Sequence, residues 1–286
     1  MTKGILIYAH NNRSVDYALM SIVAGGLAKK HLQVPASLVT DQSTVDWMHE
    51  SKIYAKAQEV FENIIIVPRP PANNYRRLHD GAEHSTVTFM NGNRYSAWKQ
   101  TPYDRTLMID ADFFIFSNAL GEYWDVDNDL LIGESISDIY DNNRLGYCDR
   151  YISEVGTKLY WATTVMFTKN SYTKLFFDLV QIIQDNYQYF ADTYRFDSKQ
   201  YRNDIAFSIA KHILDGFENI DTICLPPVLT LLDKDILHDI DQDKLTVLIS
   251  HKLDANFCAA TLKNTDIHIM NKQSIVRNIS KLMDLV

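Results

Sequence analysis

Cysteine is scarce in this sequence, and the patterns that it forms in disulfide-rich and zinc-binding proteins are missing. The three cysteines, Cys148, Cys224 and Cys258, are odd in number and widely spaced, which fits neither a disulfide framework nor a CxxC zinc site. Residues 1–8 enter an apolar strand without the h-region of a signal peptide, and no apolar run approaches the ~20 residues that span a bilayer. We therefore expect reduced thiols, a cytoplasmic location and no membrane insertion.

An excess of basic charge is also missing. Lys and Arg number 28 against 36 Asp and Glu, which gives a net charge of −8 and an isoelectric point near 5.5. This overall field argues against a protein that coats nucleic acid or an anionic membrane, and it leaves room only for a local basic patch. Neither GxGxxG nor GxxxxGK(S/T) occurs, which argues against dinucleotide oxidoreductases and P-loop NTPases.

The residues that are present predict an α/β fold. Hydrophobic residues make up 46% of the chain, enough for a sizeable core, and no repeat, low-complexity tract or linker divides it, so we expect one domain over residues 1–286. The early part alternates apolar runs with helical spacing, which predicts a mainly parallel sheet flanked by helices. The expected strands are 4–8, 36–40, 63–67, 106–109, 245–250 and 266–270, and the expected helices are 14–31 with Ser14 as N-cap, 45–60, 171–190, 203–214 and a short terminal one.

Polar residues follow several of these strands. Parallel sheets bind ligands beyond the carboxyl ends of their strands. The candidates are therefore His10, Asn11 and Asn12 after the first strand, Thr40 and Asp41 after the second, and Asp110 and Asp112 after residues 106–109.

The Asp110 and Asp112 pair is the most informative of these. Both carboxylates follow an apolar strand, one residue apart, and therefore lie on one side of the extended chain. Five other Asp-x-Asp triplets occur, but only this one has apolar residues on both sides, where two like charges are costly without a cation. Oxygen ligands suit Mn²⁺ or Mg²⁺, so we expect a metal here that holds a diphosphate.

A family resemblance starts at this pair. Residues 94–98 (RYSAW), 103–105 (YDR) and 110–112 (DAD) resemble the K-L-x-x-W, Y-x-K and D-A-D run of the family 8 glycosyltransferases, which include glycogenin and galactosyltransferases, with every interval matched. Residues 160–167, 202–208 and 267–272 resemble further segments of that family. Within them, Ala162 and Ile205 replace an asparagine and a glutamine, and Asn271 replaces a glycine.

The resemblance implies a GT-A (Rossmann-like) fold and a metal-dependent transfer of sugar from a nucleotide-sugar, usually a UDP-sugar. It implies Asp110, Asp112 and His268 as the ligands of Mn²⁺ or Mg²⁺, with Ala111 between the two aspartates at the cofactor site. Lys272 is expected to contact the diphosphate, and Arg94 to contact phosphate or a sugar hydroxyl. Retention of configuration is the outcome in this family.

Asp204, with Asn203, is expected to orient the sugar, so that Asp204, Arg94 and Lys272 are the candidate catalytic residues. The alternative for Asp204 is a helix N-cap.

The nucleoside is expected near Ala9, His10, Asn11 and Asp41. The family often stacks an aromatic ring on uracil two residues after its asparagine. Arg13 stands there in this chain. Tyr17, or stacking by a guanidinium group, is the expected substitute.

The acceptor is expected on the second part of the chain, about residues 116–286, with nucleotide binding in residues 1–115. Residues 186–202 interleave rings with cations, and residues 68–79 carry Arg69, Arg76, Arg77 and His79. Rings with cations bind sugars or exposed bases, although a half-buried helix end gives the same pattern. The whole chain is also similar to glycosyltransferases of large bacteriophages, which would place it in the host cytoplasm. The acceptor would then be a glycan, a protein or a hydroxymethylated base in phage DNA. The alternative function is a non-catalytic sugar-nucleotide or glycan-binding module on the same fold.

Overall fold

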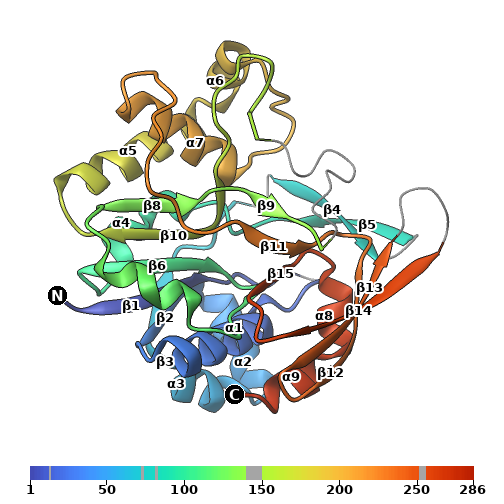
Figure 1. Cartoon of the computed structure of the whole chain (residues 1–286). Helices are drawn as coiled ribbons and strands as arrows, with labels where there is room; N and C mark the ends of the chain where they lie inside the picture. The colour runs from blue at the N-terminus through green and yellow to red at the C-terminus, as the bar shows by residue number, and fades with distance from the viewer. Residues whose placement is uncertain (13, 72–73, 81–82, 140–149, 251–255) are drawn as a thin grey trace.

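A six-stranded sheet forms the centre of the computed structural model, which describes residues 1–12, 14–71, 74–80, 83–139, 150–250 and 256–286. The strand order is β3-β2-β1-β6-β10-β8 (Figure 1), with β3, β2, β1 and β6 parallel and β10 antiparallel to both of its neighbours. These strands are β1 (Lys3–Tyr8), β2 (Ala36–Asp41), β3 (Phe61–Val67), β6 (Arg105–Asp110), β8 (Leu130–Gly133) and β10 (Trp161–Thr168). The predicted mixed, mainly parallel sheet is confirmed.

Helices cover both faces of this sheet, as Figure 1 shows. Ile5 and Ile7 of β1 pack into the core under α1, whereas Leu6 and Tyr8 pack into the core under α5 and α7. Burial on both faces explains why the central strands show no polar and apolar alternation. One face carries α1 (Tyr17–Leu32), α2 (Gln42–Glu50) and α3 (Tyr54–Val60), and the other carries α4 (Ala97–Gln100), α5 (Ser171–Asp185), α6 (Tyr187–Tyr194) and α7 (Asn203–Leu214).

Three predicted helices have different limits in the structure. The first begins at Tyr17 rather than at residue 14, because Asp16 and not Ser14 caps it: the Asp16 carboxylate accepts a hydrogen bond from the Leu19 amide at 3.0 Å. The helix expected over 45–60 is two helices, α2 and α3, separated at Lys52, whose φ of 60° interrupts a right-handed helix. The one expected over 171–190 ends at Asp185, and α6 follows after Asn186.

Smaller sheets bring the C-terminal part of the chain against the central sheet. In the four-stranded sheet β7-β15-β11-β9, β15 pairs with β7 so that His268 lies opposite Phe113. This pairing places a C-terminal histidine beside the residues that follow β6. The strands are β7 (Phe113–Phe114), β9 (Ile136–Ser137), β11 (Val228–Leu231), β15 (Ile267–Ile269), and, in a separate three-stranded sheet, β12 (Ile236–Asp241), β13 (Lys244–Ser250) and β14 (Phe257–Lys263).

A hairpin of β4 (Tyr75–Asp80) and β5 (Glu83–Thr88) leaves the main sheet and is held by the C-terminal helices. The Arg277 guanidinium donates to both oxygens of Asp80 at 2.6 and 2.8 Å, and Asn271 donates to the same carboxylate at 3.2 Å. The remaining elements are η1 (Arg94–Ser96), η2 (Ala119–Asp125), α8 (Lys272–Arg277) and α9 (Ile279–Met283). Within the described ranges, every helix is too short or too polar for a bilayer span.

Candidate metal centre and ligand cavity

Asp110, Asp112 and His268 form a cluster at the carboxyl end of β6. Asp110 is the last residue of β6, Asp112 precedes β7, and His268 is the middle residue of β15. The His268 Nε2 atom lies 3.5 Å from Asp112 Oδ2 and 4.0 Å from Asp110 Oδ2. Among the described residues, this is the only group of three acidic, histidine or cysteine side chains whose ligand atoms converge, all within 4.8 Å of one another.

Two buried cations neutralise the two carboxylates. Arg94 pairs with Asp110 and donates to the Ala162 carbonyl at 3.1 Å, and Lys272 pairs with Asp112 and donates to the Ile269 carbonyl at 3.1 Å. Burial works to raise the pKa of Asp110, but Arg94, His268 and a 3.0 Å hydrogen bond from Thr163 together hold this pKa below its usual value. Asp110 is therefore ionised at neutral pH, as a metal ligand must be.

Burial also sets the protonation of the other two groups. It lowers the pKa of His268 to about 4, so the imidazole is neutral at pH 7 and can offer a lone pair. It lowers the pKa of Lys272 to about 7. Two carboxylate oxygens and a neutral imidazole nitrogen form a donor set that suits Mn²⁺ and accepts Mg²⁺.

A cavity of about 510 Å³ opens over this cluster. Its volume is in the usual range for small-molecule sites, which is roughly 300–1,000 Å³. Eight of the residues predicted to bind the metal or the nucleotide-sugar or to act in catalysis line it, namely Tyr17, Arg94, Asp110, Ala111, Asp112, Asp204, His268 and Lys272. Arg76, Arg77 and His79 of β4 line it as well, as do Trp161 and Thr163 of β10 and Asn91.

Asp204 lies at the first turn of α7 and faces this cavity. The helix starts at Asn203, the N-cap position belongs to Arg202, and no side chain caps it, so the N-cap interpretation of Asp204 is wrong. Asp204 is 8% exposed and pairs with Arg202. The Asn203 amide donates to the Asn91 carbonyl at 3.2 Å, while its buried Oδ1 has no hydrogen-bond partner among the described residues.

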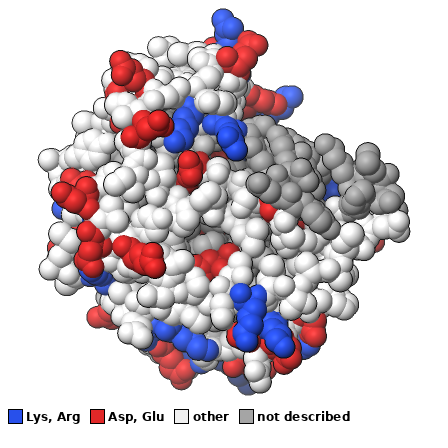
Figure 2. Space-filling model, in the orientation of Figure 1, with Lys and Arg blue, Asp and Glu red and all other residues white. Residues whose placement is uncertain are grey.

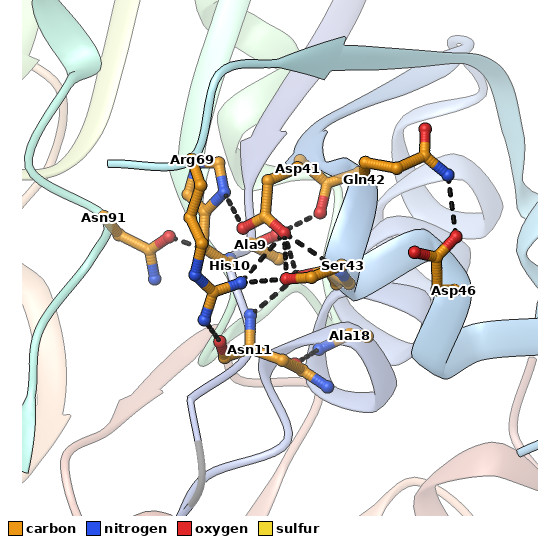
Figure 3. A network of polar contacts seen from close by, with 12 residues as sticks. Ala9, His10, Asn11, Ala18, Asp41, Gln42, Ser43, Asp46, Arg69 and Asn91 are labelled. Atoms are coloured by element: carbon orange, nitrogen blue, oxygen red, sulfur yellow. Dashed lines mark hydrogen bonds and ion pairs between the residues drawn. The ribbon is translucent and has the colours of Figure 1, made fainter. Parts of the chain in front are cut away.

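Ala9, His10, Asn11 and Asp41 lie at the ends of β1 and β2, but they are not among the residues that line the cavity. Figure 3 shows the network that engages them. His10 Nδ1 is 3.0 Å from Asp41 Oδ2, and the Arg69 guanidinium donates to Asp41 and to the Asn11 carbonyl, both at 3.0 Å. These contacts occupy the Asp41 carboxylate and the Asn11 carbonyl, whereas His10 Nε2 is buried without a hydrogen-bond partner among the described residues. Nucleoside binding by these residues stays a prediction, and Arg13 lies outside the described residues.

Replacement of Asp41 by asparagine is expected to destabilise the protein by on the order of 2 kcal/mol at pH 7. Asp41 is 1% exposed, and hydrogen bonds from His10, Ser43 and Thr44 hold its pKa below the usual value against the effect of burial. A carboxyl group with a depressed pKa stabilises the fold above its unfolded pKa, and this stabilisation is lost as the pH falls through the folded value. The free energies of unfolding of Asp41→Asn and of the unchanged protein, measured in urea, should differ at pH 7. This difference should shrink progressively below pH 4. An equal difference at every pH would contradict this assignment.

Several residues of the matched segment serve packing rather than ligand binding. The Trp98 indole donates to the Asn170 carbonyl at 3.0 Å, and the Tyr103 hydroxyl lies 2.7 Å from Ser37 Oγ. The Tyr103 ring also occupies the space beside Gly4, where a Cβ atom would approach it to 2.4 Å. Trp98 and Tyr103 of the matched segment therefore contribute to the fold beside Asp110 and Asp112.

The aromatic segment 186–202 is largely packed on itself. The Tyr187 ring contacts Phe196 and Tyr201 with centroid distances of 5.2 and 5.0 Å, and Tyr194 is 6% exposed. Tyr189, at 67% exposed, is the ring that remains on the surface. These contacts fit the half-buried helix end better than a platform of free rings.

No protein-family model and no curated protein matches the sequence. Similar solved structures include the glycosyltransferase GlyE of Streptococcus pneumoniae, with 13% identity and a TM-score of 0.40 over 80% of this chain and 45% of that one. Galactosyltransferase LgtC, solved with donor and acceptor sugar analogues, shows 15% identity and a TM-score of 0.45 over 72% and 70%. Mouse xyloside xylosyltransferase 1 shows 12% identity and a TM-score of 0.42 over 75% and 83%. The chain thus spans less than half of the GlyE chain.

Proposed function

We propose that this protein is a metal-dependent glycosyltransferase that moves a sugar from a nucleotide-diphosphate sugar, with UDP favoured, to an acceptor hydroxyl. The observation that carries the proposal is the convergence of Asp110, Asp112 and His268 at the carboxyl end of β6, on the floor of a cavity that Arg94 and Lys272 also line. The same residues carry the resemblance to family 8 in the sequence.

The donor set fits a divalent cation. Two carboxylates in a largely buried position are costly unless positive charge accompanies them, and here Arg94 and Lys272 supply it. Mn²⁺ or Mg²⁺ bound by Asp110, Asp112 and His268 would act as a Lewis acid toward the leaving diphosphate. With the carboxylates neutralised by the cation, Arg94 and Lys272 would be free to bind phosphate oxygens.

The other cavity residues suit the sugar and the nucleoside. Asp204 and Asn203 offer oxygen acceptors at the start of α7 for sugar hydroxyls, and Tyr17 offers a buried ring for the nucleoside end. Transfer with retention requires no strong protein base if the leaving phosphate assists a front-face exchange. We therefore assign no protein nucleophile, and Asp204 acts by orienting the sugar.

A glycan is the acceptor that we favour, with a protein or a hydroxymethylated DNA base as the other possibilities. Figure 2 shows that acidic and basic side chains of the described residues are interspersed on this face, without a continuous basic surface for a nucleic-acid backbone. The net charge of −8 points the same way. Titration with plain and hydroxymethylated DNA at low salt should therefore give no binding.

The test is a donor screen with the full chain and Mn²⁺ but no acceptor. We expect slow release of UDP from at least one UDP-sugar, loss of this release with EDTA, and product sugar of retained configuration by NMR once an acceptor is found. Failure of UDP to bind in the presence of Mn²⁺ would overturn the proposal. Tight, metal-dependent binding without turnover of any donor or acceptor would instead identify a sugar-nucleotide-binding module.

A further inference from the structure

Arg76 differs from Arg94, Lys272 and Arg202 of the cavity in having no carboxylate partner among the described residues. Its guanidinium stacks on the Phe89 ring, with Cζ 3.8 Å from the ring centroid, and its Nε atom is buried without a hydrogen-bond partner among the described residues. Arg94, Lys272 and Arg202, by contrast, each pair with an aspartate of the same cavity. A partly buried guanidinium held against a ring and left unpaired is poised for an anionic group of a ligand.

The charges that line the cavity support this assignment. The described lining contains five basic side chains and four carboxylates, namely Arg76, Arg77, Arg94, Arg202 and Lys272 against Asp110, Asp112, Asp204 and Asp233. A divalent cation and the doubly charged diphosphate of a sugar nucleotide cancel each other. With Arg94 and Lys272 directed to the diphosphate, the three remaining arginines, Arg76, Arg77 and Arg202, would outnumber Asp204 and Asp233, and a neutral sugar would not balance the difference. Burial of an excess charge is unfavourable, so a further anionic group stabilises the loaded site.

The position of Arg76 shows which part of the ligand this group belongs to. The Asn74 amide donates to the Tyr201 carbonyl at 3.2 Å, which holds the start of β4, and Arg76 with it, beside the segment that leads into α7 and Asp204. Asp204 already pairs with Arg202, so it does not use up the charge of Arg76. Arg76 therefore lies toward the sugar side of the cavity, near the residue proposed to orient the sugar.

We propose that Arg76 binds a carboxylate or phosphate group carried by a sugar in this cavity, so that the enzyme prefers an acidic sugar to a neutral one. This inference rests on the proposed function. The position of the hairpin supports selectivity, because β4 is tied to α8 through Asp80 and Arg277 and the Arg76 guanidinium is itself stacked on Phe89. A neutral sugar would leave Arg76 desolvated and unpaired. The neutral sugar would therefore bind more weakly than an acidic one.

Calorimetric binding with Mn²⁺ tests the inference on the full chain. We expect UDP-glucuronate to bind at least about tenfold more tightly than UDP-glucose, and Arg76→Gln to reduce this ratio to near one while UDP keeps its affinity within about twofold and UDP-glucose binds no more weakly. Unchanged UDP binding also reports that the variant is folded. Arg76→Lys should retain part of the preference, because it keeps the charge but loses the planar fork. Arg195→Gln, an exposed arginine outside the cavity lining, is the control and should retain all of it.

A second arm places the acidic group on the acceptor. Protein saturated with UDP and Mn²⁺ is titrated with glucose, glucuronate and glucose 6-phosphate. If the protein prefers the charged sugars and Arg76→Gln removes this preference, the inference holds and the acidic group belongs to the acceptor. Absence of a charge preference in both arms would overturn the inference. An equal loss of UDP, UDP-glucose and UDP-glucuronate binding in Arg76→Gln would overturn it too, because Arg76 would then be a diphosphate ligand. Failure of the unchanged protein to bind UDP would overturn the proposed function itself.

Discussion

Asp112→Asn is expected to abolish Mn²⁺-dependent UDP binding and to lower donor cleavage by about a thousandfold. The amide keeps the shape of the side chain but removes one of the two negative charges that balance the cation, and an amide oxygen is a far weaker metal ligand in this position. The variant keeps His268 and Asp110, whose Nε2 and Oδ2 atoms are 4.0 Å apart in the structure. A single carboxylate and an imidazole bind Mn²⁺ weakly on their own. Calorimetry measures metal-dependent UDP binding, and chromatography of released UDP measures cleavage.

The control for this substitution has to separate metal loss from unfolding. Asp112 pairs with buried Lys272, and removing one partner of a buried ion pair costs about 3–5 kcal/mol of stability. The double variant Asp112→Asn with Lys272→Met removes both charges, so it should recover most of the thermal stability and stay unable to bind Mn²⁺.

A second control replaces an aspartate of the same spacing elsewhere. Asp127 belongs to the exposed Asp-x-Asp triplets of residues 125–129, outside the cavity lining. Asp127→Asn should leave both UDP binding and cleavage unchanged. Full activity of Asp112→Asn, or an equal loss in Asp127→Asn, would show that the metal site lies elsewhere.

The central strands and α7 could be predicted because their signals are local. β1, β2 and β6 are buried on both faces, so each contains a short apolar stretch without helical spacing, too short for a buried helix. The helix expected over residues 203–214 has the same limits in the structure, since its apolar spacing begins at Ile205 and stops before Gly216.

The hairpin that covers the cavity could not be predicted from its own sequence. β4 contains Arg76, Arg77 and His79 among its six residues and lacks the alternation of a half-buried strand. It is a strand because it pairs with β5 and is tied through Asp80 to α8, almost two hundred residues further along the chain. Contacts between distant segments of this kind leave no local pattern.

The same distinction applies to the group of Asp110, Asp112 and His268 and to the residues around it. Asp110, Asp112 and His268 were accessible through their spacing and the family resemblance. Thr163 was not, because its hydrogen bond to Asp110 depends on the antiparallel register in which Thr164 faces Ile109. The network of His10, Asp41 and Arg69 could not be predicted either. A polar residue at the end of a strand can bind a ligand or a neighbouring side chain, and the sequence does not distinguish the two.

Phe207→Ala is expected to lower the free energy of unfolding by about 3–5 kcal/mol. Phe207 of α7 is fully buried and makes edge-to-face contacts with Phe176 and Phe177 of α5, with centroid distances of 5.4 and 6.0 Å. A cavity between two helices and the sheet cannot collapse without moving all three, so most of the lost contact energy is not regained. Urea unfolding measures the change. Phe217→Ala, at a position that is 66% exposed just after the same helix, should change stability by less than about 0.5 kcal/mol.

The same variant separates the two parts of the site. Asp110, Asp112 and His268 lie on β6, at the start of β7 and on β15, whereas Asp204 lies on α7. Phe207→Ala below its unfolding temperature should therefore bind Mn²⁺ and UDP with nearly unchanged affinity, while its affinity for the sugar, measured as the ratio of UDP-sugar to UDP binding, falls several-fold because α7 is less firmly held. Loss of Mn²⁺ binding in the folded variant would contradict this division, since it would make the metal cluster dependent on the helix that carries Asp204.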